Sequence, residues 1–144
     1  MKLLVLNGPN INMLGVREPE KYGTTSFETL EKEIYAYSFE LGINVETFQS
    51  NSEGEIIDKI QQSIATFDGI LINAGGYSHT SVAIRDAIAA VSLPCVEVHI
   101  TNIYAREEFR HNSLVAPVCT GQISGFGANS YKLGMKALFD ILKK

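Results

Sequence analysis

Glu97 and His99 are the two residues whose types and spacing point most directly to chemistry. They stand two positions apart in the run Pro94–Ile100, which we expect to be a strand, so their side chains face the same side. A carboxylate beside an imidazole holds the ring in one orientation and one tautomer, which suits a general acid or base. The alternative interpretation is an ion pair at the end of a strand, or a histidine satisfied within the core.

The long segment 8–24 carries a second pair, Arg17 and Tyr22, together with Asn10. A phenol has a reference pKa of about 10, and a close cation lowers it. Such a pair could act as a base and an electrostatic clamp, whereas the ordinary alternative is two solvated loop residues. Loops of this length inside a compact domain are uncommon and tend to be functional lids or disordered.

Further polar side chains follow the buried run Gly69–Ile72, in a glycine-containing turn with Asn73 and His79. A second polar connection, after His99, contains Arg110, whose guanidinium could bind a carboxylate or a hydroxyl of a substrate. An ordinary loop rich in turn formers would also explain the first group. A surface arginine in a Glu-rich segment would equally explain the second.

Strands and helices alternate along the chain. The expected strands are 2–6, the residues around 45–47, 69–72, 94–100 and 119–124; the expected helices are 25–41, which begins at the capping box Thr25–Glu28, and 52–64, 81–91 and 128–142. This alternation predicts an α/β fold of the flavodoxin-like, three-layer type. A single domain, 1–144, would then contain a five-stranded parallel sheet in the order 2-1-3-4-5, with helices on both faces. The loops after the first, third and fourth strands would converge at one edge of the sheet.

The composition narrows the class of protein. The chain has 144 residues, of which 45% are hydrophobic, and a formal net charge of −4, which argues against a general binder of nucleic acid or acidic membranes. No run approaches the roughly 20 apolar residues of a membrane span. The N-terminus lacks the layout of a signal peptide, so we expect a cytoplasmic protein with Cys95 and Cys119 as reduced thiols.

The sequence contains no motif that indicates a bound cofactor or metal. A phosphate-binding P-loop is absent, and Gly125-Phe-Gly127 comes too late in the chain to be a dinucleotide fingerprint. The three histidines lack the compact spacing of metal ligands. We therefore expect neither cofactor nor metal. A non-catalytic flavodoxin-like binding or signalling module, or a flavin or nucleotide protein, would share the fold but would leave the polar constellation unexplained.

Three ordered motifs make the chain resemble type II 3-dehydroquinate dehydratases over essentially its whole length. The stretch Asn7-Gly-Pro-Asn-Ile-Asn-Met-Leu-Gly-Val-Arg-Glu-Pro-Glu-Lys-Tyr-Gly23 is similar to the first family signature. Gly75-Gly-Tyr-Ser-His-Thr-Ser-Val-Ala-Ile-Arg-Asp86 is similar to the second. Glu97-Val-His-Ile-Thr-Asn102, followed by Arg106-Glu-Glu-Phe-Arg110, is similar to the third.

The resemblance implies a reaction and assigns roles to residues. It implies reversible, cofactor-independent dehydration of 3-dehydroquinate to 3-dehydroshikimate in the shikimate route. The loop tyrosine, here Tyr22, would remove a proton next to the ketone to give an enolate, with the help of Arg17. Asn10 would help to place a water that stabilises the enolate. His99 would protonate the departing hydroxyl, oriented by Glu97.

The resemblance also implies a substrate site and an assembly. Asn73, His79 and Arg110 match the residues that bind the substrate hydroxyls, and Ile100 with Thr101 matches the carboxylate site. Asp86 matches a residue that approaches the site of a neighbouring subunit, because the family forms trimers assembled into dodecamers. Two positions depart from the common pattern: Ala74 stands where many members have proline, and Thr101 where many have serine.

Overall fold

The computed structural model describes residues 1–16, 18–22 and 25–144, with the side chain of Tyr22 outside the description. Its centre is a parallel sheet with the strand order β2-β1-β3-β4-β5, as predicted. The strands are β1 (Lys2–Asn7), β2 (Asn44–Gln49), β3 (Gly69–Asn73), β4 (Cys95–His99) and β5 (Gly121–Ser124). The register pairs the ends of the first and third strands, Asn7 with Asn73.

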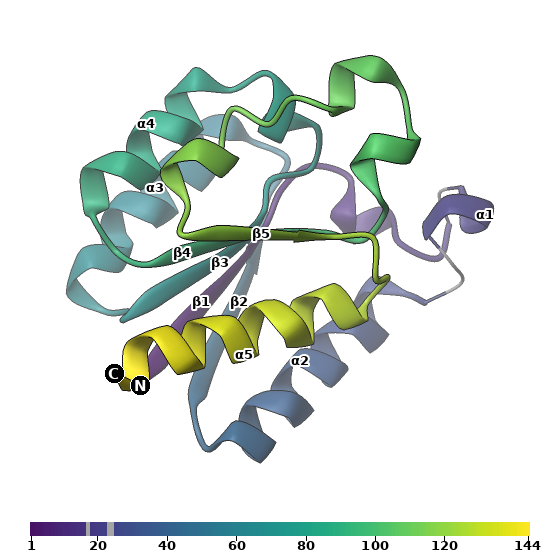
Figure 1. The fold of residues 1–144 in the computed structure, drawn as a ribbon. Coiled ribbons are helices and arrows are strands. Elements are labelled where there is room, and N and C mark those ends of the chain that lie inside the picture. Colours follow the sequence, from purple (N-terminus) through teal and green to yellow (C-terminus); the bar gives the residue numbers. More distant parts are fainter. Residues whose placement is uncertain (17, 23–24) are drawn as a thin grey trace.

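Two layers of helices cover the sheet (Figure 1). The longer helices are α2 (Phe27–Leu41), α3 (Glu53–Gln62), α4 (Val82–Val91) and α5 (Asn129–Lys143). Figure 1 shows α2 and α5 on one face and α3 and α4 on the other. This confirms the predicted three-layer, flavodoxin-like sandwich. Within the described part of the chain, none of the helices is long and apolar enough to cross a membrane.

Helix boundaries follow local capping chemistry. Ser52 and Ser81 accept hydrogen bonds from backbone N–H groups three residues on, at the starts of α3 and α4. Gly42 ends α2 in the left-handed conformation, as expected of a C-terminal glycine. The predicted capping box at Thr25 was wrong by one residue. Ser26 is the N-cap of α2, and its hydroxyl accepts from the backbone N–H of Thr29 at 3.1 Å.

Two other predictions differ from the structure. The segment 8–24, expected to lack regular structure, contains a 3₁₀ turn η1 (Ile11–Met13) and a short helix α1 (Pro19–Tyr22). A single helical turn is too short to leave a periodic pattern in the sequence. The fifth strand begins at Gly121 rather than at Cys119, because the backbone N–H of Cys119 still donates to the carbonyl oxygen of Ala116 in the 3₁₀ turn η6 (Ala116–Val118) at 3.0 Å.

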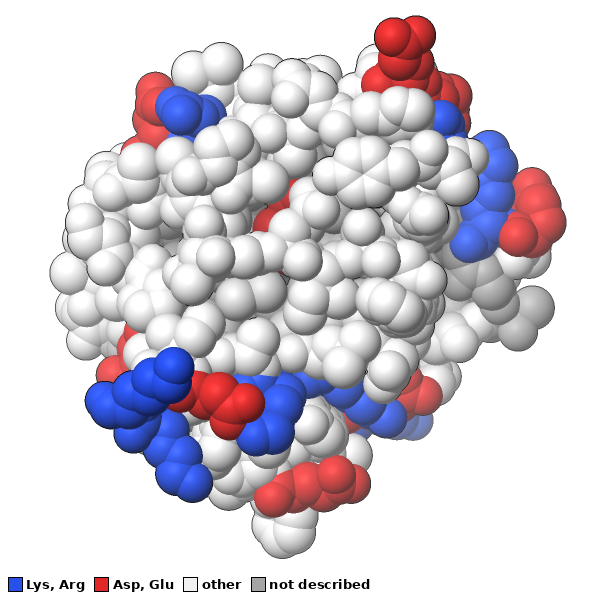
Figure 2. Space-filling view, viewed as in Figure 1, with Lys and Arg blue, Asp and Glu red and all other residues white. Residues whose placement is uncertain are grey.

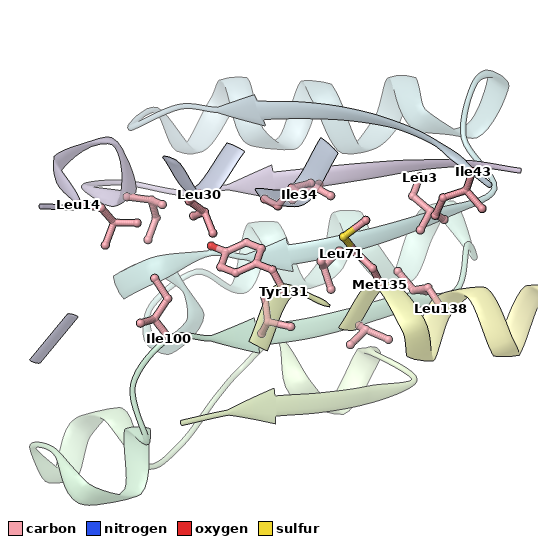
Figure 3. Packing of buried hydrophobic residues seen from close by; sticks show 14 residues of the cluster. Leu3, Leu14, Leu30, Ile34, Ile43, Leu71, Ile100, Tyr131, Met135 and Leu138 are labelled. Atoms are coloured by element: carbon pink, nitrogen blue, oxygen red, sulfur yellow. The ribbon is translucent and has the colours of Figure 1, made fainter. Parts of the chain in front are cut away.

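The core lies in two parts, one under each helical layer. Tyr131, Met135 and Leu138 of α5 face the residues Leu3 and Leu71 of the sheet (Figure 3). Five further residues, Ile56, Ile60, Ile84, Ile88 and Val91, fill the opposite part from α3 and α4. The three middle strands are therefore buried on both faces, which explains their nearly unbroken apolar runs.

Close packing of α5 on the sheet requires a residue without a side chain at Gly134. A Cβ there would meet Leu71 Cδ1 and, at 2.8 Å, Val98 Cγ1. Gly54 in α3 is the contrasting case. A Cβ at Gly54 would have Ser52 Oγ at 3.9 Å as its nearest neighbour, which is ordinary contact.

Replacing these two glycines by alanine should change the free energy of unfolding in opposite directions. Gly134→Ala should lower the free energy of unfolding by about 1–3 kcal/mol, because overpacking outweighs the gain in helix propensity. Gly54→Ala should raise it by about 0.5–1 kcal/mol, because alanine is the better helix former and space is available. Denaturant unfolding of both variants measures the difference. A stabilised Gly134→Ala protein would contradict the packing described between α5 and the sheet.

Candidate active site

A cleft of about 180 Å³ opens at the carboxyl ends of β1, β3 and β4. The predicted convergence of the three loops at this edge is therefore found in the structure. Seven of the site residues predicted from the sequence line the cleft: Asn10, Asn73, His79, His99, Ile100, Thr101 and Arg110. Further lining comes from Pro9, Ile11, Gly75, Gly76, Ile103 and Arg106.

Glu97 and His99 form a pair at the base of this cleft. Both project from β4 to the same side, and His99 Nε2 lies 3.0 Å from Glu97 Oε2. Glu97 is fully buried and His99 is 5% exposed. Burial raises the pKa of the Glu97 carboxyl, but the hydrogen bond and charge of His99, together with Ser113 and Gln122, outweigh it and hold the pKa below its usual value. The carboxylate is thus an anion facing an imidazole.

His79 lies beside this pair, on the 3₁₀ turn η3 (Gly75–His79) that follows β3. Its ring stacks near that of His99, with 6.1 Å between centroids and 18° between planes. Its Nδ1 lies 3.0 Å from the carbonyl oxygen of Asn112, so Nδ1 carries the proton. Burial, with the positive charges of His99 and Arg110, lowers the pKa of His79. His79 is therefore a neutral ring.

A buried tyrosine fixes the ends of β1 and β3. Tyr131 of α5 donates its hydroxyl proton to Asn7 Oδ1 at 2.6 Å and accepts from Asn73 Nδ2 at 2.8 Å. Asn73 Oδ1 accepts in turn from the backbone N–H of Gly75 at 3.1 Å. Gly75 has a φ of 60°, which favours glycine. The turn that presents Asn73 and His79 is consequently held from below by a helix far along the chain.

The turn that carries Asn10 is held from the end of β2. Asn10 has a φ of 70°, a left-handed conformation that asparagine tolerates better than most residues. Its backbone N–H donates to Asn51 Oδ1 at 3.1 Å, and Gln49 Nε2 donates to the carbonyl oxygen of Gly8 at 3.2 Å. Sequence reasoning missed Gln49 and Asn51, and no local pattern marks them.

Two arginines bring positive charge to the rim of the cleft. Arg110 lies on η5 (Glu108–Arg110), and its Nε donates to Glu107 Oε2 at 3.1 Å. Arg106, which the sequence predictions did not include among the site residues, donates from Nη1 to Thr101 Oγ1 at 3.3 Å. Its place in the third motif was the available signal for it. The cleft therefore suits a small, hydroxylated or carboxylated ligand.

Two predicted residues that the structure describes, Glu97 and Asp86, do not line the cleft. Glu97 lies behind His99, and Asp86 is exposed on α4, 3.7 Å from its neighbour Arg85. Arg17 lies outside the described residues, and so does the side chain of Tyr22, whose backbone ends α1. The proposed base and its cation therefore stay predictions.

A larger hollow of about 710 Å³ adjoins the cleft and shares Ile100, Thr101 and Arg106 with it. Lys21 of α1 and the residues before α5 line its far side. It lacks the Glu97–His99 pair, so the smaller cleft is the candidate active site. Among the residues that the structure describes, no group of three His, Cys, Asp or Glu side chains could hold a metal ion.

Comparisons with known proteins agree with this geometry. The sequence model of the family "Dehydroquinase class II" matches residues 1–139. The 3-dehydroquinate dehydratase of Geotalea daltonii is 56% identical over 144 residues, which cover 100% of both chains. That of Caldicellulosiruptor bescii is 58% identical over 142 residues and 98% of both chains. The crystal structure of a type II dehydroquinase from Butyrivibrio crossotus has a TM-score of 0.95 at 51% identity, covering 96% of this chain and 97% of that one.

A match over nearly the full chain, in sequence and in structure, leaves one assignment: the chain belongs to the class II dehydroquinase family.

Proposed function

We propose that this protein catalyses the reversible dehydration of 3-dehydroquinate to 3-dehydroshikimate, the hydro-lyase step of the shikimate route, and that residues 1–144 form one catalytic domain. Family membership supplies the reaction. The structural observation that supports it most is the Glu97–His99 pair in a small polar cleft, with His99 Nε2 3.0 Å from Glu97 Oε2. A proton donor placed in this way is what a departing hydroxyl needs.

The reaction begins at the carbon next to the ketone. Tyr22 removes a proton from it, with Arg17 lowering the cost of ionising the phenol, and an enolate forms. Asn10 places a water on the enolate oxygen, a role that its position in the cleft supports. A protonated His99 then gives a proton to the leaving hydroxyl from Nδ1, since its Nε2 is engaged with Glu97. Side-chain acids and bases suffice for these steps, so the reaction proceeds without cofactor or metal.

Substrate binding uses the other residues of the cleft. Asn73, His79 and Arg110 take the ring hydroxyls, and the backbone and side chain at Ile100 and Thr101 take the carboxylate. Arg106 supports the last assignment, because its guanidinium lies 3.3 Å from Thr101 Oγ1 and places positive charge beside the carboxylate site.

We further propose that the protein acts in the cytoplasm as a dodecamer built of trimers, with Asp86 of one subunit near the site of its neighbour. The exposure of Asp86 on α4 supports this role. Figure 2 shows a face over β5 that is largely uncharged, with Lys, Arg, Asp and Glu mainly toward its margins. Large apolar side chains are exposed at Val82, Phe109 and Phe126. Such surfaces favour association between subunits.

The reaction is tested directly by mixing the purified protein with 3-dehydroquinate and following the absorbance of the conjugated enone. His99→Ala should lower kcat by roughly 10²–10⁴-fold, the usual cost of a lost proton transfer. His111→Ala is the matched control, because that residue is exposed and does not line the cleft. A folded His99→Ala protein with near-normal turnover would rule out the acid role.

Tyr22 and Arg17 give a second prediction. Tyr22→Phe should lose nearly all turnover and still bind substrate, because the ring stays and the base is removed. Arg17→Ala should do similar damage and move the basic limb of the residual pH–rate profile upward, because the phenol then ionises only at higher pH. Kinetics against pH, with calorimetric binding, measure both. Tyr104→Phe, at an exposed tyrosine, is the control; substantial turnover in Tyr22→Phe would require another base.

The assembly prediction concerns the protein in solution. Sedimentation should show a dodecamer, or at least a trimer, because the uncharged face over β5 and the exposed apolar side chains are then covered. Asp86→Ala should lower activity when the subunits are assembled. A stable, fully active monomer would refute both the assembly and the role of Asp86.

A further inference from the structure

The carboxylate of Glu97 is a buried charge that needs hydrogen-bond partners within the protein. It is fully buried on β4, a strand whose other residues, apart from His99, are apolar. A buried carboxylate is tolerated only where hydrogen bonds and opposite charge replace the lost water. The proposed mechanism uses Glu97 to orient His99. The hydrogen bond to His99 engages Oε2 of the carboxylate, and Oε1 needs a different partner.

Two further side chains complete the surroundings of Glu97. Ser113 Oγ donates to Oε1 at 2.5 Å and also lies 3.0 Å from Oε2. Gln122 Nε2, on β5, donates to Oε2 at 2.6 Å. The two come from separate segments, the connection before η6 and the edge strand, and they meet only at this carboxylate. The group is therefore held from three sides.

The direction of the hydrogen bond from Ser113 is determined by the backbone. Ser113 Oγ accepts from the backbone N–H of Val115 at 3.2 Å and of Ala116 at 3.0 Å. A hydroxyl has two acceptor positions and one proton, so the proton is left for Glu97. Gln122 likewise presents its amide nitrogen, because its oxygen would oppose a carboxylate oxygen. Every one of these neighbours donates, and so Glu97 is held as an anion.

We propose that Ser113 and Gln122 are positioning residues that hold the Glu97 carboxylate as an anion against His99, and so decide which ring nitrogen of His99 carries the transferable proton. An anionic Glu97 requires a proton on Nε2 of His99. Nδ1 is then the nitrogen that gains and loses a proton in the cleft. The effect on turnover rests on the proposed function. The tautomer of His99 can be measured without substrate.

Four other titratable groups of the described residues face the same region, and these four make none of the hydrogen bonds to Glu97. His79 comes from η3, Arg110 from η5, and Cys95 and Cys119 lie at the starts of β4 and just before β5. His79 and Arg110 lie on the cleft side of His99. The sulfur atoms of the two cysteines lie 3.7 Å from each other. All four groups are the same in the wild type and in the variants below, so they do not cause differences between them.

The test compares Gln122→Met and Ser113→Ala with the wild type. Each removes a donor to the anion, which raises the pKa of Glu97, so Glu97 becomes protonated at a higher pH. The acidic limb of the kcat profile should therefore move to higher pH. The value of kcat should fall by about tenfold or more, which is part of the loss expected when the acid itself is removed. The value of KM should stay within about threefold of the wild-type value. Ser113→Thr keeps the hydroxyl and should restore most of kcat.

Making the same substitutions in a Glu97→Gln protein separates a positioning role of Ser113 and Gln122 from a merely structural one. A residue that acts through the Glu97 anion should change kcat by less than about threefold when Glu97 is already neutral. An equal loss in both backgrounds, or a lower kcat with an unmoved acidic limb, overturns the proposal. Gln122→Met lies on an edge strand and keeps the apolar bulk of the side chain, so it serves if Ser113→Ala fails to fold.

A measurement without substrate keeps this test apart from that of the function. Nitrogen-15 spectra of histidine-labelled protein should show His99 protonated at Nε2 in the wild type and in Ser113→Thr. Gln122→Met should show a mixture of tautomers. Wild-type-like spectra in Gln122→Met overturn the inference even if the enzyme is active. Absence of dehydration in the wild type, with the expected spectra, overturns the proposed function alone.

Discussion

The burial of β1, β3 and β4 between two helical layers is the constraint from which the rest of the structure follows. Residues on both faces of these strands are excluded from water, so nearly every position is apolar. Polar side chains are displaced to the carboxyl ends, where Asn7, Asn73 and His99 stand at adjacent strands. Glu97 is the exception within a strand, and it is tolerated because its oxygens meet donors from three segments.

The same constraint explains how the site is kept in shape. Short 3₁₀ turns follow the strands and carry the side chains that line the cleft. Buried side chains such as Ile11 and Ile103 anchor two of these turns, and long-range hydrogen bonds hold the polar ends of others. Tyr131 links α5 to the ends of β1 and β3. Burial raises the pKa of its hydroxyl above the usual value, so it remains a neutral donor in this network.

Much of the fold could be predicted because its causes are local. Apolar runs mark the strands, serine caps and Gly42 mark helix ends, and alternation of the two determines the layers. The residues at strand ends, including Asn73 and His99, follow from that frame. Ser113, Gln122 and Tyr131 could not be found in this way, because their partners lie 16, 25 and 58 residues away and depend on which strands are neighbours. The helix α1 was missed because one turn has no period.

Ala74 illustrates what the turn after β3 does and does not require of its sequence. Its φ of −76° is one that a proline ring would allow, and Asn73 before it is extended, as a residue before proline should be. The close approach of the neighbouring loop at Gly8, where a Cβ would meet the Ala74 carbonyl oxygen at 2.5 Å, already holds the backbone in place. The backbone of the folded turn is therefore compatible with either residue. Alanine acts on the unfolded chain, whose additional freedom at this position opposes folding by about 0.4–1 kcal/mol.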